Sequence, residues 1–176
     1  MTGTRDRLLV VALAVALVAA LVAAVLLWRD RDDTDDRASS SESLVEAEIA
    51  AEAAAQDVLE RMTTYSFRTV EEDFGWVDDA TTEKFQGSFA EAREAALTYV
   101  TAVKATAEGS VVDSAATAAD ADHVKVLLFA DQEIRSTRDK GYRLDQSRVT
   151  MQMVRQDGEW LVDEVEVVNV LGGARE

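Results

Sequence analysis

The residues of this chain that could support metal or acid–base chemistry are few and scattered. The sole histidine, His123, follows Asp120 and Asp122 in a segment that reads as a turn before a strand. The chain has no cysteine and no second histidine, so it lacks the nitrogen and sulfur ligands of a zinc or iron site. We expect His123 to be a surface turn residue, and we expect no bound metal.

Acid–base catalysis in a pocket would need a carboxylate in apolar surroundings beside a phenol or a second carboxyl group. The candidate donors are Tyr65, Tyr99, Tyr142, Asp57 and Asp131. Their spacing singles out no pair, and in so acidic a chain some carboxylate near some tyrosine is expected by chance. A phosphate-binding glycine loop, a nucleophile elbow and a metal-binding helix motif are all missing. We therefore expect no catalytic residue, no cofactor and no enzymatic activity.

An apolar run near the N-terminus predicts that the chain is attached to a membrane. Residues 8–28 are 21 apolar residues without charge, Pro or Gly, and as a helix they would measure about 31 Å, close to the hydrocarbon thickness of a bilayer. A cleavable signal peptide is the alternative. Its apolar region is usually shorter and ends in a small-residue cleavage site, whereas this run leads directly into Trp28 and Arg29. The sequence thus predicts a single transmembrane anchor after a tail of residues 1–7.

The predicted anchor carries a stripe of small residues. Alanine recurs every fourth position, a small-xxx-small pattern that allows close helix approach, at Ala12, Ala16, Ala20 and Ala24. We regard this stripe as a candidate helix-docking face, although alanine is common throughout the chain. Basic residues flank the run on both sides, so the positive-inside rule allows the C-terminal part to lie outside the membrane without requiring it.

The charge of the remaining chain excludes several partners. Residues 29–176 contain 16 Lys and Arg against 33 Asp and Glu, a formal charge of −17. Nucleic acid requires a basic surface, and anionic lipid headgroups would repel this part of the chain. Residues 29–43 are charged and Ser-rich and predict a linker. We expect one domain over residues 44–170 and a flexible tail over residues 171–176.

Two capping boxes predict the helices that begin this domain. Ser43 with Glu46 predicts a first amphipathic helix over about residues 44–64, and Ser88 with Glu91 predicts a second that ends at Gly109. The residues between them predict a short helix and loops.

From Ser110 onward, β-branched residues and alternation predict four strands near residues 111–118, 123–135, 144–156 and 159–168. Asp157-Gly158 is a two-residue hairpin signal. The clearest alternation places Arg148, Thr150 and Gln152 on one face and Val149, Met151 and Met153 on the other. Helices followed by antiparallel strands predict an α+β domain, with a curved antiparallel sheet packed on helices.

Polar residues in the third predicted strand form a candidate partner-binding patch of Arg143, Asp145 and Arg148. An internal ion network is the alternative for the same residues. Apolar residues of the last strand are explained by packing, and Trp160 is expected to be a core indole after the hairpin.

Three segments carry a resemblance to a known family. Residues 119–132 (ADADHVKVLLFADQ), 142–154 (YRLDQSRVTMQMV) and 156–162 (QDGEWLV) resemble the C-terminal half of the Mce-associated membrane proteins of actinobacteria. A short tail, one span, an acidic linker and an Ala-rich first helix leading to Tyr65-Ser66-Phe67 agree with that layout. The chain departs from the family pattern where Gln86 precedes Gly87-Ser88-Phe89, in place of the usual Thr-Gly.

The resemblance implies a domain of the nuclear-transport-factor-2-like (NTF2-like) type, a cone of curved sheet over helices. It also implies a non-enzymatic, single-pass accessory subunit of a mammalian-cell-entry (Mce) lipid transporter, with a cytoplasmic N-terminus, a domain outside the membrane, and transporter or permease subunits as partners. Association with further copies of the same chain is also compatible with the sequence. The main alternative is a module that binds a lipid or another hydrophobic small molecule in the cone. An apolar pocket would support that alternative, and a cone filled by Phe129, Met151, Met153 and Trp160 would remove its basis.

Overall fold

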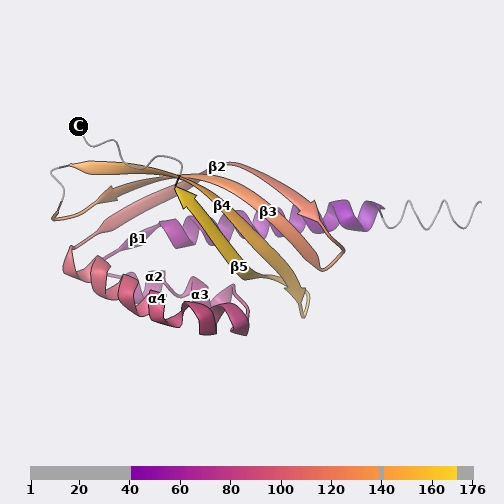
Figure 1. Cartoon of the computed structure of the whole chain (residues 1–176), viewed down its shortest axis with the longest axis horizontal. Helices are drawn as coiled ribbons and strands as arrows, with labels where there is room; N and C mark the ends of the chain where they lie inside the picture. The colour runs from indigo at the N-terminus through magenta and orange to yellow at the C-terminus, as the bar shows by residue number, and fades with distance from the viewer. Residues whose placement is uncertain (1–40, 139–140, 170–176) are drawn as a thin grey trace, which may run out of the picture. The chain divides into compact units, whose positions relative to one another are not determined.

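The computed structural model describes residues 41–138 and 141–169 (Figure 1). The boundary between the two units of the chain lies after Ser43, and the second unit is described here. Its elements, in order, are an N-terminal helix over residues 41–63, β1 (Tyr65–Ser66), α2 (Val70–Asp73), α3 (Trp76–Asp79), α4 (Glu83–Ala102), β2 (Thr106–Ala118), β3 (His123–Arg135), β4 (Tyr142–Gln156) and β5 (Glu159–Asn169).

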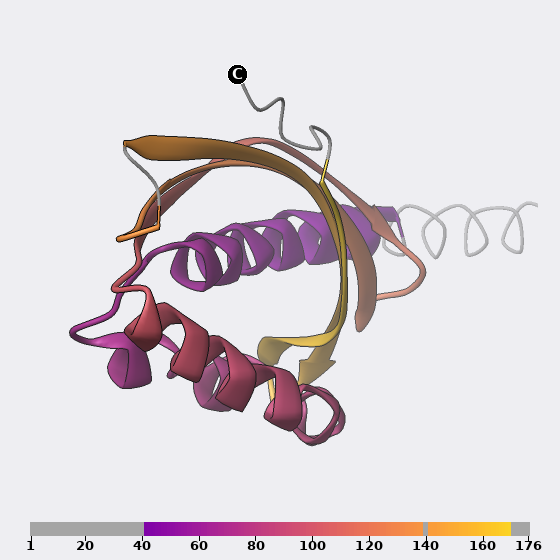
Figure 2. The same cartoon turned by 60° about the vertical axis from the view of Figure 1, so that its left-hand side comes forward.

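The five strands form one antiparallel sheet in the order β1-β2-β3-β4-β5. The sheet curls around the N-terminal helix, and α2, α3 and α4 lie at its open side (Figures 1 and 2). The prediction of an α+β domain with a curved antiparallel sheet packed on helices is therefore confirmed. The predicted hairpin is confirmed as well, because Asp157 and Gly158 have φ angles of 52° and 89°, as a two-residue type I′ turn requires.

The four long strands lie close to their predicted positions. Strand β2 begins at Thr106, before the predicted start at residue 111, because its first residues pair with β1 and with the end of β3. The alternation along β4 is also confirmed. Val149, Met151 and Met153 are buried on the concave face, whereas the residues between them lie on the outer face.

The concave face of the sheet is covered by the N-terminal helix. Ala51, Ala55 and Leu59 of this helix are fully buried, and they belong to one core cluster with concave-face side chains of β3 and β4, such as Leu128 and Met151. Alanines on the packed side of the helix let its backbone approach the sheet closely. The core of the domain thus lies inside the curl.

Both predicted capping boxes were wrong. The N-terminal helix is already formed at residue 41, so Ser43 lies within it. Helix α4 begins at Glu83, and its N-cap is Thr82, whose Oγ1 accepts a hydrogen bond from the Phe85 N–H at 3.2 Å. Ser88 lies one turn inside α4 and donates to the Phe85 carbonyl instead.

Helix α4 also ends earlier than predicted, at Ala102. Lys104 adopts a left-handed backbone (φ 51°) just after the helix, which stops it before Gly109 is reached. Gly109 lies within β2, where it serves a close packing contact described below.

The start of α4 is held to β5. The backbone N–H of Thr82 donates to the Val162 carbonyl and the N–H of Val162 donates to the Ala80 carbonyl, at 3.0 and 2.9 Å. The Thr82 hydroxyl also donates to Asp163 Oδ1 at 2.9 Å, and Lys84 pairs with the same carboxylate. One threonine therefore both caps the helix and fastens it to the sheet.

Replacing Thr82 with alanine should lower the free energy of unfolding by about 1–2 kcal/mol, because the helix loses its cap and β5 loses a hydrogen bond. Urea unfolding followed by circular dichroism measures the change. Thr82→Ser keeps the hydroxyl and is the control, expected to lose at most a few tenths of a kcal/mol. Equal stability of the two variants would contradict the role given to the hydroxyl.

Acid should weaken the contact between α4 and β5. The Lys84 ammonium and the Thr82 hydroxyl hold the pKa of Asp163 below its ordinary value of 3.8. A carboxylate with a lowered folded-state pKa stabilises the fold above its unfolded-state pKa and loses this effect as the pH falls through the folded-state value. The site is partly exposed, so the effect should stay under about 1 kcal/mol.

Comparing wild type with Asp163→Asn in urea at pH 6 and at pH 2.5 measures this effect. The variant should be less stable at pH 6, and the difference should shrink at pH 2.5. A difference that is the same at both pH values would show that the carboxylate charge does not matter.

Candidate functional site

The interior of the cone is filled by side chains of the domain itself. Trp76, Leu128, Met151 and Val162 are at most 1% exposed and belong to the core cluster, together with the N-terminal helix. Of the four residues whose packing in the cone would count against a ligand pocket, Met151 and Met153 are buried in it, and Trp160 is half-buried and packs against it. Phe129 instead lies on the outer face of β3 and is 40% exposed, because it alternates with the buried Leu128.

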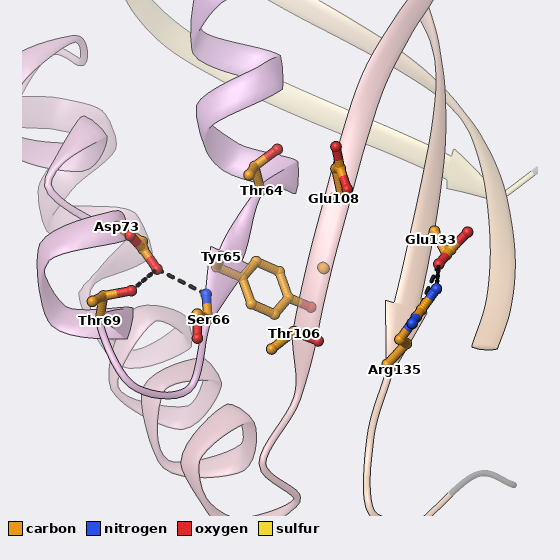
Figure 3. Close-up of a pocket in the computed structure, with 10 residues that line it drawn as sticks. Thr64, Tyr65, Ser66, Thr69, Asp73, Thr106, Glu108, Glu133 and Arg135 are labelled. Carbon is orange, nitrogen blue, oxygen red and sulfur yellow. Dashed lines mark hydrogen bonds and ion pairs between the residues drawn. The ribbon is translucent and has the colours of Figure 1, made fainter. Parts of the chain in front are cut away.

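A groove of about 570 Å³ lies at the β1 side of the sheet (Figure 3). The short strand β1, Thr69 and the end of α2 form one side of it, and β2 and β3 supply the rest. Its lining residues are Thr64, Tyr65, Ser66, Thr69, Asp73, Thr106, Ala107, Glu108, Glu133 and Arg135. The groove is open to solvent and mostly polar, so it suits a hydrated polar chain better than an aliphatic tail.

Hydrogen bonds within the groove already engage several of its charged groups. Asp73 Oδ2 accepts from the Ser66 N–H at 2.8 Å and from the Thr69 hydroxyl at 2.9 Å, which orders the turn between β1 and α2. Across the groove, Arg135 donates to Glu133 Oε1 from Nε and Nη2, at 3.0 and 2.6 Å. Figure 3 shows these two sets on opposite sides. Asp73 therefore orders a turn, and Glu133 neutralises the charge of Arg135.

The phenol of Tyr65 has the most perturbed surroundings of the groove residues. Its ring lies 6.1 Å from the ring of Phe74, and burial raises the pKa of the Tyr65 phenol, while nearby Arg143 lowers it and Asp145 raises it. A phenol with a raised pKa stays protonated at neutral pH. Tyr65 can therefore donate or accept a hydrogen bond but does not provide a phenolate base.

The other acid–base candidates lie apart from one another. Asp57 pairs with Arg61 on the N-terminal helix, and Asp131 accepts a hydrogen bond from Gln146 at 2.9 Å on the outer face of the sheet. Tyr99 lies on α4, where Arg138 donates to its hydroxyl at 3.3 Å. The structure brings neither carboxylate to a tyrosine through these contacts.

The predicted patch of Arg143, Asp145 and Arg148 is divided between two faces of the sheet. Arg143 Nε and Nη2 donate to the two oxygens of Asp145, each at 2.8 Å, and both residues lie toward the concave side of β4. Arg148 is an odd number of residues away and lies on the outer face, opposite Phe129 of β3. The structure thus brings two of the three together as an ion pair and leaves Arg148 outside it.

The remaining predictions concern the histidine, a metal site and the transmembrane span. His123 is exposed at the surface, with Nδ1 2.9 Å from Asp120 Oδ1, but it is the first residue of β3 and not part of the turn before it. In residues 41–138 and 141–169, no three metal-ligating side chains gather, and no helix is long and apolar enough to cross a bilayer. The predicted span over residues 8–28, with Ala12, Ala16, Ala20 and Ala24, lies outside these described residues.

The sequence did not predict the groove. Strand β1 has only two residues, and it pairs with Ala107 and Thr106 about forty positions later, a contact that no local pattern reports. One local signal was available, because Thr69 and Asp73 are spaced one helical turn apart.

The sequence model of the family described as "Uncharacterized protein Rv1363c/MT1408-like" matches residues 7–169 of this chain. The chain belongs to the Rv1363c/MT1408-like family. No curated protein matches it. The family description does not mention Mce transport.

Solved structures resemble this Rv1363c/MT1408-like chain in fold. An IcmL-like type IV secretion system protein of Legionella pneumophila subsp. pneumophila strain Philadelphia 1 has a TM-score of 0.58 at 8% identity, covering 70% of this chain and 94% of that one. CagV, a VirB8 homolog of Helicobacter pylori strain 26695, has a TM-score of 0.58 at 11% identity, with 70% and 100% covered. The periplasmic domain of DotI has a TM-score of 0.56 at 15% identity, with 66% and 91% covered. At these identities the likeness shows the NTF2-like fold alone.

Proposed function

We propose that this chain is a non-catalytic, membrane-anchored accessory subunit of an Mce-type lipid transport system, with its domain outside the membrane. The observation that carries the proposal is the filled cone. The concave face, where an NTF2-like domain would hold a substrate, is occupied by the N-terminal helix and by side chains such as Met151 and Trp76. A domain with its interior occupied in this way acts through its surface.

The fold relatives support an assembly role. The IcmL-like protein and CagV are named as type IV secretion system components, and the DotI match is a periplasmic domain. The same fold is thus used in multiprotein systems of the bacterial envelope. The choice of an Mce transporter rests on the resemblance of residues 119–132, 142–154 and 156–162 to Mce-associated proteins.

One observation favours the alternative of a lipid or hydrophobic small-molecule binding module. The indole N–H of Trp76 is buried in the core and has no hydrogen-bond partner among the described residues. A buried donor of this kind is costly unless a polar atom satisfies it. A ligand with an acceptor group would meet that need if the core opened to admit it.

Copurification from native membranes tests the two functions. The full-length chain, expressed in an actinobacterial host and treated with a mild crosslinker, is purified from detergent extracts, and its partners and bound lipids are identified by mass spectrometry. Repeated recovery of Mce and permease subunits is the expected result. A chain that comes alone with a stoichiometric lipid would overturn the accessory role in favour of the binding module.

A further inference from the structure

The two edges of the sheet differ in how they are protected. On the β2 side, β1 pairs with the first residues of the strand, and side chains from the N-terminal helix region continue the cover. The Gly109 N–H donates to the Thr64 hydroxyl at 3.2 Å, and the Ala118 N–H donates to Glu48 Oε1 at 2.8 Å. These contacts engage two outward N–H groups of β2 beyond its pairing with β1.

On the β5 side, only the first half of the strand is covered. The segment before α4 makes an isolated parallel bridge from Thr81 to Val162. Beyond it, from Glu164 to Asn169, no strand among the described residues pairs with the outer side of β5. An unpaired strand edge is a template for an added strand.

The pairing register shows which N–H and C=O groups of β5 point away from β4, toward the free edge of the sheet. Val162 directs its N–H and C=O away from the sheet, to Ala80 and Thr82, opposite Met153 of β4. A register shift beside Gln152 adds one residue to β5, but the alternation along β4 continues through it. The residues that pair with Met151 and Val149 therefore also direct their N–H and C=O groups to the free edge. These partners are Val165 and Val167.

From Glu164 to Val167 the side chains along this edge alternate between acidic and aliphatic, and Val168 follows on the outer face. Glu164 and Glu166 are exposed on the outer face, whereas Val165 and Val167 lie on the concave side, where Val167 is 50% exposed. A strand added here would place alternate side chains beside the two glutamates and the others beside the valines. Lysine or arginine alternating with aliphatic residues would match both rows.

We propose that the edge of β5 from Glu164 to Asn169 docks an extended, basic and aliphatic segment of a partner subunit by strand addition. A second copy of this chain is a poorer occupant, because it would bring the same glutamates and a further charge of −17 from its residues 29–176. The inference rests on the proposed function in taking the chain to be an assembly subunit, and it names the surface used.

A defined peptide tests the edge. Full-length protein in detergent is titrated with acetyl-Lys-Val-Lys-Val-Lys-Val-Lys-amide and with the same peptide carrying Glu in place of Lys, while hydrogen exchange is followed by mass spectrometry. The basic peptide should bind and protect residues 164–169, and the acidic one should not. Val167→Pro, which removes an outward N–H without breaking a bond to β4, should weaken binding about tenfold.

Two controls keep the result interpretable. Val167→Thr keeps the N–H and the branched shape, and it should bind the basic peptide within about twofold of wild type. If Val167→Pro unfolds, the double variant Glu164→Lys with Glu166→Lys replaces it, since two lysines in this row should reverse the preference toward the acidic peptide. Equal binding of both peptides, protection at another segment, or unchanged affinity in the variants would overturn the proposal.

A concentration-dependent dimer abolished by Val167→Pro would show a second copy as the occupant and would also overturn it. The proposed function is tested separately by copurification. If Val167→Pro still recovers transporter subunits, the edge is wrong while the accessory role stands. If the basic peptide binds as expected but transporter subunits never copurify, the role is wrong while the edge stands.

Discussion

Gly109→Ala should destabilise the domain by about 3 kcal/mol or more. A Cβ atom at Gly109 would overlap Oγ1 and Cβ of Thr63 and would also lie 3.3 Å from its carbonyl carbon. Thr63 is buried at the end of the N-terminal helix, and its hydroxyl donates to the Leu59 carbonyl at 2.6 Å. It cannot move aside without losing that hydrogen bond or shifting the helix from the sheet.

Gly87→Ala is the matched control for this substitution. Gly87 lies inside α4, and a Cβ there would meet nothing within 4 Å. Alanine is the better helix former, so this variant should gain about 0.5–1 kcal/mol. Urea unfolding of both variants measures the two effects. If Gly109→Ala retained wild-type stability, the close contact between β2 and the N-terminal helix would be wrong.

Truncating Leu59 to alanine should cost about 3–4 kcal/mol. Leu59 is fully buried where the N-terminal helix packs into the curled sheet, and its removal would leave a cavity among residues that cannot collapse around it. The expected readout is a lower urea midpoint with an unchanged slope, since the surface exposed on unfolding stays similar.

Leu144→Ala is the same chemical change on the outer face of β4, where the side chain is 53% exposed. Its effect should stay within about 0.5 kcal/mol. A similar loss in both leucine variants would mean that the helix is not packed in the curl. It would also remove the main support for a filled cone, and with it the argument that the domain works through its surface.

The sheet was predictable because its signal is local. Alternation along β4 fixes which face Val149 and Met151 occupy, and Asp157-Gly158 fixes the hairpin that follows. The start of α4 was not predictable in this way. Ser88 with Glu91 fits a capping box better than Thr82 does, but the hydrogen bonds of residues 80–82 to β5 are tertiary contacts, and they place the helix start six positions earlier.

The candidate patch is divided between two faces for a reason that the sequence already contained. Arg143 and Asp145 are two positions apart and share a face, whereas Arg148 belongs with Thr150 and Gln152 on the other face. The groove at β1 is a different matter. It is formed by residues near position 65, near 107 and near 134, and no short-range pattern relates these three segments.

The burial of the N-terminal helix also has a mechanical meaning. This helix is the first described element after the predicted anchor, and its residues Ala51, Ala55 and Leu59 sit in the middle of the core. A pull arriving along the chain from the N-terminal side would therefore load the core in shear, with many contacts resisting at once. Strands would not be peeled off one at a time, so the domain should resist tension that reaches it through its first helix.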